Sequence, residues 1–250
     1  MHLSKYTHAL RRGRFRDCFV LLGLIAMLCL TACSSNSLTR PHATEMINSS
    51  EEFKQPVAVT LLPEYHQSLT LIGADSHTTP KTDFALQRFL ESHAELAVLN
   101  HLGLVDFKVS SIEYPDSASS PVSVNSSLTE KGRAASRQWQ QSGEGWAIPI
   151  AKKEVVEVTG IAGGEGDSKT ARAEYKWRWQ PTEVGKSFDK SDSAYQNVPA
   201  SIRSNLGGAS MADMMRQLGN GVAFDSSQTQ KASASFRLYD DGWRQVKEGK

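Results

Sequence analysis

The chain is poor in cysteine, and its three cysteines all lie near the N-terminus. Cys18, Cys29 and Cys33 are the only cysteines among 250 residues. Residues 34–250 therefore contain no thiol, and this part of the chain forms neither a disulfide nor a thiolate metal site. A packed apolar core has to stabilise it instead, and the chain is long enough to bury one.

The chain also lacks a long hydrophobic run and a large net charge. The apolar run at residues 19–30 is shorter than the roughly 20 residues that span a bilayer as a helix. Basic and acidic residues number 28 and 27, and without residues 1–32 the counts become 23 and 26. No polybasic segment that would bind nucleic acid or anionic lipid is present.

The N-terminal 33 residues have the pattern of an export signal. A basic stretch precedes the apolar run, which ends in Leu-Thr-Ala-Cys at residues 30–33. This tetrapeptide resembles the lipobox of bacterial lipoproteins, and the resemblance implies that residues 1–32 are a removable signal peptide and that Cys33 is acylated. The alternative is an uncleaved or ordinarily cleaved signal with Cys33 as a chance thiol. It leaves the position of this cysteine unexplained.

The same resemblance implies a location. Lipoproteins of this class carry several acyl chains, and each buried methylene adds about 0.8 kcal/mol, so release into water is negligible. In the Gram-negative sorting pattern, a residue other than Asp after the acylated Cys favours the outer membrane, and here that residue is Ser34. The expected place is the periplasmic face of the outer membrane, with the inner membrane as the alternative.

The chain after the signal divides into a short polar segment and one domain. Residues 33–54 are rich in Ser and Asn and lack periodic apolar positions, which predicts a lipidated Cys followed by a flexible tether. Residues 55–250 are expected to form a single periplasmic domain. No internal repeat is evident in it.

Several strands are expected from period-two patterns. Residues 57–62 and 69–72 predict two short strands separated by a turn near Pro63. Residues 104–114 alternate and then shift register, which predicts a strand with a bulge. Val122 and Val124 mark a further strand.

Helices are expected in fewer places. In residues 83–102 the apolar residues recur at helical spacing, and Ser92 with Glu95 forms a capping box, so two short helices should meet near Ser92. Gly103 should end the second helix. A further helix is expected from Thr129 to about residue 139, and another at residues 210–219. Residues 186–209 are expected to be a loop.

The strongest β pattern is a long antiparallel hairpin. Apolar residues share one parity across residues 146–158 and again across 171–179, with a glycine-rich loop at 160–169. A second hairpin is expected at the C-terminus, with a type I′ turn at Asp241-Gly242. Because helices and strands are segregated along the chain, the predicted class is α+β, with an antiparallel sheet and two long hairpins packed against a few short helices.

Aromatic residues provide the main candidate for a binding surface. Tyr175, Trp177 and Trp179 share one face of the predicted hairpin, and Trp243 lies in the second hairpin. One interpretation is a sheet face packed on helices. The other is a partly exposed aromatic patch that binds an envelope protein or a glycan.

Motifs for catalysis or for cofactors are incomplete. Gly185-Lys186-Ser187 resembles the end of a phosphate-binding loop, but Gln180 stands where that loop needs a glycine. The sequence around Ser210 resembles a nucleophile elbow, but it lacks the apolar strand that should precede the serine. The preferred interpretation of Ser210 is a helix cap. The histidines lack the spacing of a helical zinc site. No catalytic residue, metal or cofactor is therefore predicted.

One local resemblance concerns residues 96–105 (LAVLNHLGLV) and 127–133 (SLTEKGR). These segments resemble the helix, the Gly-Leu turn and the Leu-Thr-x-x-Gly-Arg element of winged-helix proteins, which implies a wing-like local fold. Residues 93–102 contain no lysine or arginine, so a basic recognition helix is missing. Nucleic acid is not expected as a partner.

These observations predict an outer-membrane-anchored periplasmic lipoprotein that acts as a non-catalytic binding or assembly module of the cell envelope. One alternative is an envelope hydrolase whose Ser, His and acidic residues come together only in the fold. Another is a structural lipoprotein without a small ligand.

Overall fold

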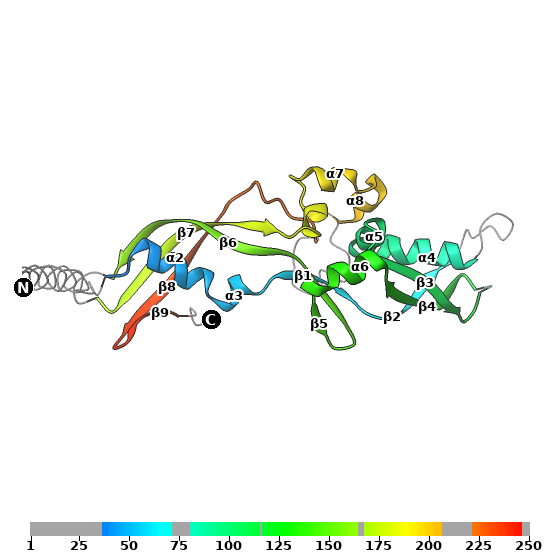
Figure 1. Cartoon of the computed structure of the whole chain (residues 1–250), viewed down its shortest axis with the longest axis horizontal. Coiled ribbons are helices and arrows are strands. Elements are labelled where there is room, and N and C mark those ends of the chain that lie inside the picture. Colours follow the sequence, from blue (N-terminus) through cyan, green and yellow to red (C-terminus); the bar gives the residue numbers. More distant parts are fainter. Residues whose placement is uncertain (1–36, 72–80, 116, 165–167, 207–221, 247–250) are drawn as a thin grey trace, which may run out of the picture.

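The fold consists of two antiparallel sheets with short helices packed on them. The computed structural model describes residues 37–71, 81–115, 117–164, 168–206 and 222–246. Short groups of helices lie between pairs of antiparallel strands, and both expected long hairpins are present (Figure 1). The predicted α+β class is confirmed.

The larger sheet contains both hairpins. Its strand order is β1-β6-β7-β8-β9, and the short strand β5 also pairs with β6. The 19-residue strand β6 pairs with β7 to form the first hairpin, and β8 pairs with β9 to form the second. The strands are β1 (Val57–Leu61), β5 (Gln140–Ser142), β6 (Gly145–Gly163), β7 (Thr170–Pro181), β8 (Gln230–Tyr239) and β9 (Gly242–Val246).

The smaller sheet has the order β2-β4-β3. It contains β2 (Glu64–Thr70), β3 (Val105–Ile112) and β4 (Ser119–Leu128), and the helices α4 (Lys81–Ser92) and α5 (Ala94–His101) pack on it. Pro63 separates β1 from β2 as expected, but the two strands join different sheets. The register of β3 against β4 shifts between Val109 and Ser111, so the predicted bulge is confirmed.

Two apolar cores lie along the elongated molecule and share strand β6. The first core contains residues of β1–β4, α4 and α5, together with Ile148 and Ile150 from the start of β6. The second core contains Val155 and Val158 from farther along β6, with residues of β7, β8 and β9. We call these parts the helix lobe and the hairpin lobe. They lie at opposite ends of Figure 1.

The segment before the first strand is helical, so the predicted tether is wrong for residues 40–54. Helix α2 (Arg40–Asn48) begins after Thr39, whose side chain accepts a hydrogen bond from the His42 amide, and helix α3 (Glu51–Lys54) follows. Both pack on β6, and their buried residues belong to the core of the hairpin lobe. Only three side chains of residues 40–54 are buried, and three such residues in a largely polar segment are too few to form a recognisable helical periodicity. The buried residues are Ala43, Ile47 and Phe53.

Two irregularities in the hairpins differ from the predictions. The register of β6 against β7 shifts between Val155 and Glu157, so Val155 is buried whereas Val156 is 48% exposed, opposite to the expected parity. The second hairpin pairs Tyr239 with Gly242. Its two-residue turn is therefore residues 240–241, and Gly242 has a φ of 125°.

Other helical segments also differ in detail. Residues 186–206 are not a loop, because η2 (Gly185–Phe188), α7 (Ser193–Asn197) and α8 (Ala200–Leu206) follow β7. The helices α4 and α5 meet where expected, but His93 is the N-cap and Ser92 Oγ donates to the Phe89 carbonyl at 2.9 Å, so the capping box is wrong. The helix predicted at residues 210–219 lies outside the described residues.

A four-residue motif occurs twice in the chain and makes the same local structure each time. Thr-Glu-x-Gly follows β4 at residues 129–132 and β7 at residues 182–185. In each copy the Thr hydroxyl accepts from the Gly amide, at 2.9 and 3.0 Å. The hydroxyl donates to the Gly103 carbonyl just before β3 in the first copy and to the Pro149 carbonyl of β6 in the second. Each Gly packs so closely on a carbonyl that a Cβ would lie 1.9 Å from Leu104 O or 1.6 Å from Ile150 O. The first copy caps α6 (Glu130–Ala135), which continues into η1 (Ser136–Gln138).

Candidate functional site

The predicted aromatic surface is part of the core of the hairpin lobe. Tyr175, Trp177 and Trp243 are 6%, 8% and 8% exposed, and Trp179 is partly buried against the same core. Burial, with a contribution from the Glu52 carboxylate, raises the pKa of Tyr175. The interpretation as a packed sheet face therefore holds, and the hypothesis of an exposed aromatic patch is wrong for the three buried residues.

Helix α3 and one lysine cover these rings. The Phe53 ring lies edge-on to Tyr175 and Trp177, with centroids 6.0 and 6.4 Å apart. Lys153 Nζ lies 4.6 Å from the centroid of Trp177, and the same ammonium group pairs with Glu52 of α3. The aromatic face thus binds this chain's own N-terminal helices.

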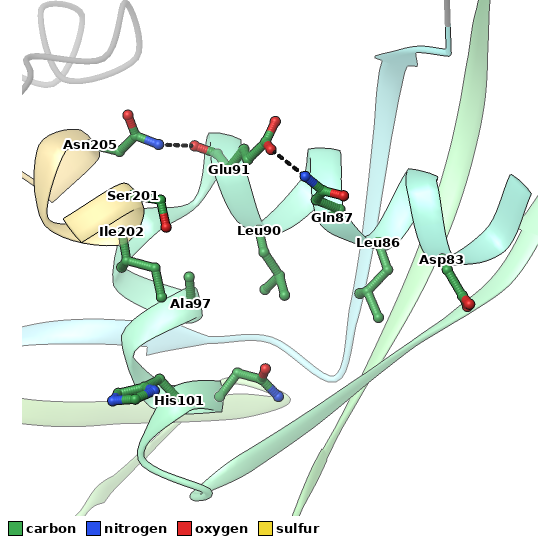
Figure 2. A pocket seen from close by; sticks show the side chains of 11 residues that line it. Asp83, Leu86, Gln87, Leu90, Glu91, Ala97, His101, Ser201, Ile202 and Asn205 are labelled. Atoms are coloured by element: carbon green, nitrogen blue, oxygen red, sulfur yellow. Dashed lines mark hydrogen bonds between the residues drawn. The ribbon is translucent and has the colours of Figure 1, made fainter. Parts of the chain in front are cut away.

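A groove in the helix lobe is the better candidate for a binding site. It has a volume of about 520 Å³ and lies between α4, α5 and α8 (Figure 2). Its size falls within the usual range of ligand sites, and its lining is mostly apolar with a polar rim. The floor is formed by Leu86, Leu90, Ala97 and Ile202.

The helical periodicity of α4 creates this groove. Leu86 and Leu90 are four residues apart and share one face of α4, whereas Phe89 is fully buried in the core. Helix α8 is held against α4 because Asn205 Nδ2 donates to the Glu91 carbonyl at 3.2 Å, an interaction drawn in Figure 2. The sequence signal for the groove was weak, since α8 lies in a segment that was expected to be a loop.

The rim of the groove is polar, with two acidic side chains. Asp83 and Glu91 both come from α4, and Glu91 also accepts hydrogen bonds from Gln87 and Arg88 at 2.9 and 3.1 Å. Asn100 donates to the Val105 carbonyl at 2.9 Å and so fixes the start of β3. Glu91 is already paired with Arg88, so the rim offers mainly hydrogen-bonding groups together with the Asp83 carboxylate.

A second groove of about 400 Å³ lies between the N-terminal helices and β9. Of the four aromatic residues predicted as a binding surface, Trp243 is the one that lines it. Arg244 and Gln245 follow on the same strand, and Glu51 and Glu52 face them from α3. This groove is smaller than the groove in the helix lobe, so it is the weaker candidate.

Asp189 is a buried carboxylate with an ordering role. It is 1% exposed and accepts hydrogen bonds from the backbone amides and hydroxyls of Ser191 and Ser226. Burial alone would raise the pKa of Asp189, but these hydrogen bonds outweigh it and hold the pKa below its ordinary value. The carboxylate joins two segments that are distant in sequence. Its two oxygens accept four hydrogen bonds from these segments.

The hydrolase hypothesis required a Ser, a His and a carboxylate within hydrogen-bond distance. One such set lies on the smaller sheet, where His66 Nδ1 is 2.9 Å from Ser123 Oγ and His66 Nε2 is 3.5 Å from Glu64 Oε2. The His66 side chain is 71% exposed, and neither groove includes the set. Catalytic groups of this kind act in sites that exclude water. Ser210, the other serine considered, lies outside the described residues.

Within the described ranges no three His, Cys, Asp or Glu side chains are arranged to hold a metal ion. Gly185 and Lys186 lie in η2, where Gly185 packs on Ile150. None of the helices that the structure describes is both long and apolar enough to traverse a bilayer. Cys33 lies outside the described residues.

Comparison with known proteins adds no relative. No protein-family model, curated protein or solved structure matches this chain. The fold itself defines the class, an α+β protein with two antiparallel sheets in which the long strand β6 of the larger sheet contributes to both apolar cores.

Proposed function

We propose that this protein is an outer-membrane lipoprotein, anchored through Cys33 on the periplasmic face, that acts as a non-catalytic binding or assembly module of the cell envelope. The lipobox-like tetrapeptide at residues 30–33 supports the anchor. The groove between α4, α5 and α8 supports the binding role and is the observation that carries it. The Ser123–His66–Glu64 set offers the hydrolase alternative no enclosed site.

The lining of the groove indicates the chemistry of its partner. Four apolar side chains form the floor, and Asp83 and Glu91 lie on the rim. An amphipathic segment of another envelope protein fits this arrangement, with apolar residues on the floor and polar residues, among them a lysine or arginine near Asp83, along the rim. A groove between helices commonly takes such a segment as a helix.

Photo-cross-linking in intact cells tests this proposal. A photoreactive amino acid at Leu86 or Ile202 should give a discrete cross-linked product, because both side chains line the groove. The matched control is the same amino acid at Lys108, an exposed position on β3 outside the groove. A Leu90→Asp substitution should remove the product, since a buried carboxylate in the interface is unfavourable.

Two outcomes of the cross-linking experiment would contradict the proposal. Equal products from the groove and from Lys108, or no product from either groove position in a folded and membrane-recovered protein, would contradict the binding role of this groove. Circular dichroism of the Leu90→Asp variant separates loss of binding from loss of folding.

A further inference from the structure

The covalent distance between the acylated residue and the folded part is short. Leu38 is five residues after Cys33 and is 6% exposed, packed in the core of the hairpin lobe. Five residues span at most about 18 Å even when fully extended. If Cys33 is in the membrane, as the proposed function requires, the end of the molecule that holds Leu38 lies at the membrane surface.

Contacts of Leu38 identify which end this is. A Cβ on Gly164, at the end of the β6–β7 hairpin, would lie 3.4 Å from Leu38 Cβ and 3.5 Å from the Trp243 ring. Trp243 pairs with Leu238 beside the β8–β9 turn, and the Leu238 amide donates to the Lys169 carbonyl. Both hairpins thus end next to Leu38, on the side of the molecule where Figure 1 shows α2.

Side chains that suit a lipid surface lie on the strands beside the β8–β9 turn, whose own two residues are Asp240 and Asp241. Tyr239 is 43% exposed, one of the few large exposed apolar or aromatic side chains in the described part of the chain. Arg244 stacks over its ring at 5.4 Å and pairs with Asp241. Arg237 lies opposite Arg244 in the register of the two strands. Tyrosine with neighbouring arginines is the composition that proteins place at the headgroup level of membranes.

We propose that this end of the hairpin lobe, with Tyr239, Arg237 and Arg244, rests on the phospholipid headgroups of the membrane that holds the lipid anchor. Tyr239 enters the interface, Arg237 binds a lipid phosphate, and Arg244 stays stacked on Tyr239 and paired with Asp241 beside them. The proposal rests on the proposed function, because without the anchor nothing holds this end at a membrane.

One consequence concerns the groove in the helix lobe. Strand β6 has 19 residues and extends from one core to the other, which corresponds to roughly 60 Å at the usual rise of a strand. With the hairpin ends on the membrane, the helix lobe points away from it. The groove is then presented to partners that are well separated from the bilayer.

Fluorescence quenching on vesicles tests this orientation. The acylated protein is reconstituted into vesicles of phosphatidylethanolamine with a minority of phosphatidylglycerol, some lipids carrying a quencher at the headgroup. Because residues 34–250 contain no cysteine, Tyr239→Cys provides one labelling site for an environment-sensitive dye. The matched control is Tyr114→Cys, which replaces another exposed tyrosine, in the β3–β4 connection of the helix lobe.

The expected result is several-fold stronger quenching, and a blue-shifted emission, for the dye at position 239 than at position 114. Equal quenching at the two positions in protein that floats with the vesicles would refute the orientation and leave the anchor intact. Protein that fails to float with the vesicles would overturn both the orientation and the anchoring in the proposed function. Unchanged circular dichroism shows that each labelled variant is folded.

Discussion

Asp189 shows how a single buried charge can hold two segments together. Its carboxylate accepts from Ser191 and Ser226, and the backbone of residues 189 and 224 forms a parallel bridge beside it. Such hydrogen bonds to a charged acceptor are worth more than neutral ones because each is strengthened by the low dielectric of the interior.

We expect Asp189→Asn to lower the free energy of unfolding by about 2 kcal/mol at neutral pH, because an amide cannot accept from four donors. The folded pKa lies below the ordinary value, so this stabilisation is present above that ordinary value and is lost as the pH falls through the folded pKa. Urea unfolding at a series of pH values measures it. Asp106→Asn, at an exposed position of β3, should change little. A variant difference that is independent of pH would contradict the assignment.

At Gly185 and Gly132 the neighbouring backbone leaves no room for a side chain. At Gly185 a Cβ would lie 1.6 Å from the Ile150 carbonyl oxygen, and backbone cannot move away as a flexible side chain can. We expect Gly185→Ala to destabilise the fold by about 3 kcal/mol, at the upper end of overpacking effects. Gly160→Ala is the control, since nothing lies within 4 Å of its Cβ position and its φ is not positive. Equal thermal stabilities of the two variants would count against the close contact.

At the scale of elements, α3 is the clearest case of a helix made stable by its contacts. Four residues are too short to be helical in isolation, so the packing of Phe53 against Tyr175 and Trp177 must hold α3 in place. The ion pair of Glu52 with Lys153 adds a second link between α3 and β6.

We expect Phe53→Ala to cost about 3 kcal/mol of unfolding free energy and to expose the tryptophans of the hairpin lobe, because it removes a buried aromatic side chain and leaves a cavity. Lys54→Ala changes the next residue, which is exposed, and should have little effect. Tryptophan fluorescence during urea unfolding measures the stability of both variants. If Phe53→Ala were as stable as the unmodified chain, residues 40–54 would behave as the tether that the sequence predicted.

At the scale of the whole molecule, the proposed location depends on one residue. We expect Cys33→Ala to move the protein from the membrane fraction to the soluble fraction, because the apolar run at residues 19–30 is too short to span a bilayer and no described helix can do so. Fractionation of cells and mass measurement of the exported product check this. Continued recovery of Cys33→Ala in membranes, or an unmodified thiol in the natural protein, would refute the lipid anchor.

Local patterns were sufficient to predict much of the fold. The period-two stripe of β7, the bulge in β3 and the break between α4 and α5 were all predicted, because each depends on neighbours within a few residues. The α+β class followed from their order along the chain. The lipobox-like tetrapeptide is also a local signal, and it remains a prediction.

Only the tertiary structure decided where these elements lie and what they cover. Pairing sent β1 and β2 to different sheets, and the shared strand β6 divided one expected core into two. The groove needed α8 to lie against α4, and the aromatic stripe needed α3 to bury it. Such contacts join residues far apart in sequence, and their free energy comes from apolar area that is buried only after the chain has folded, so local periodicity carries no record of them.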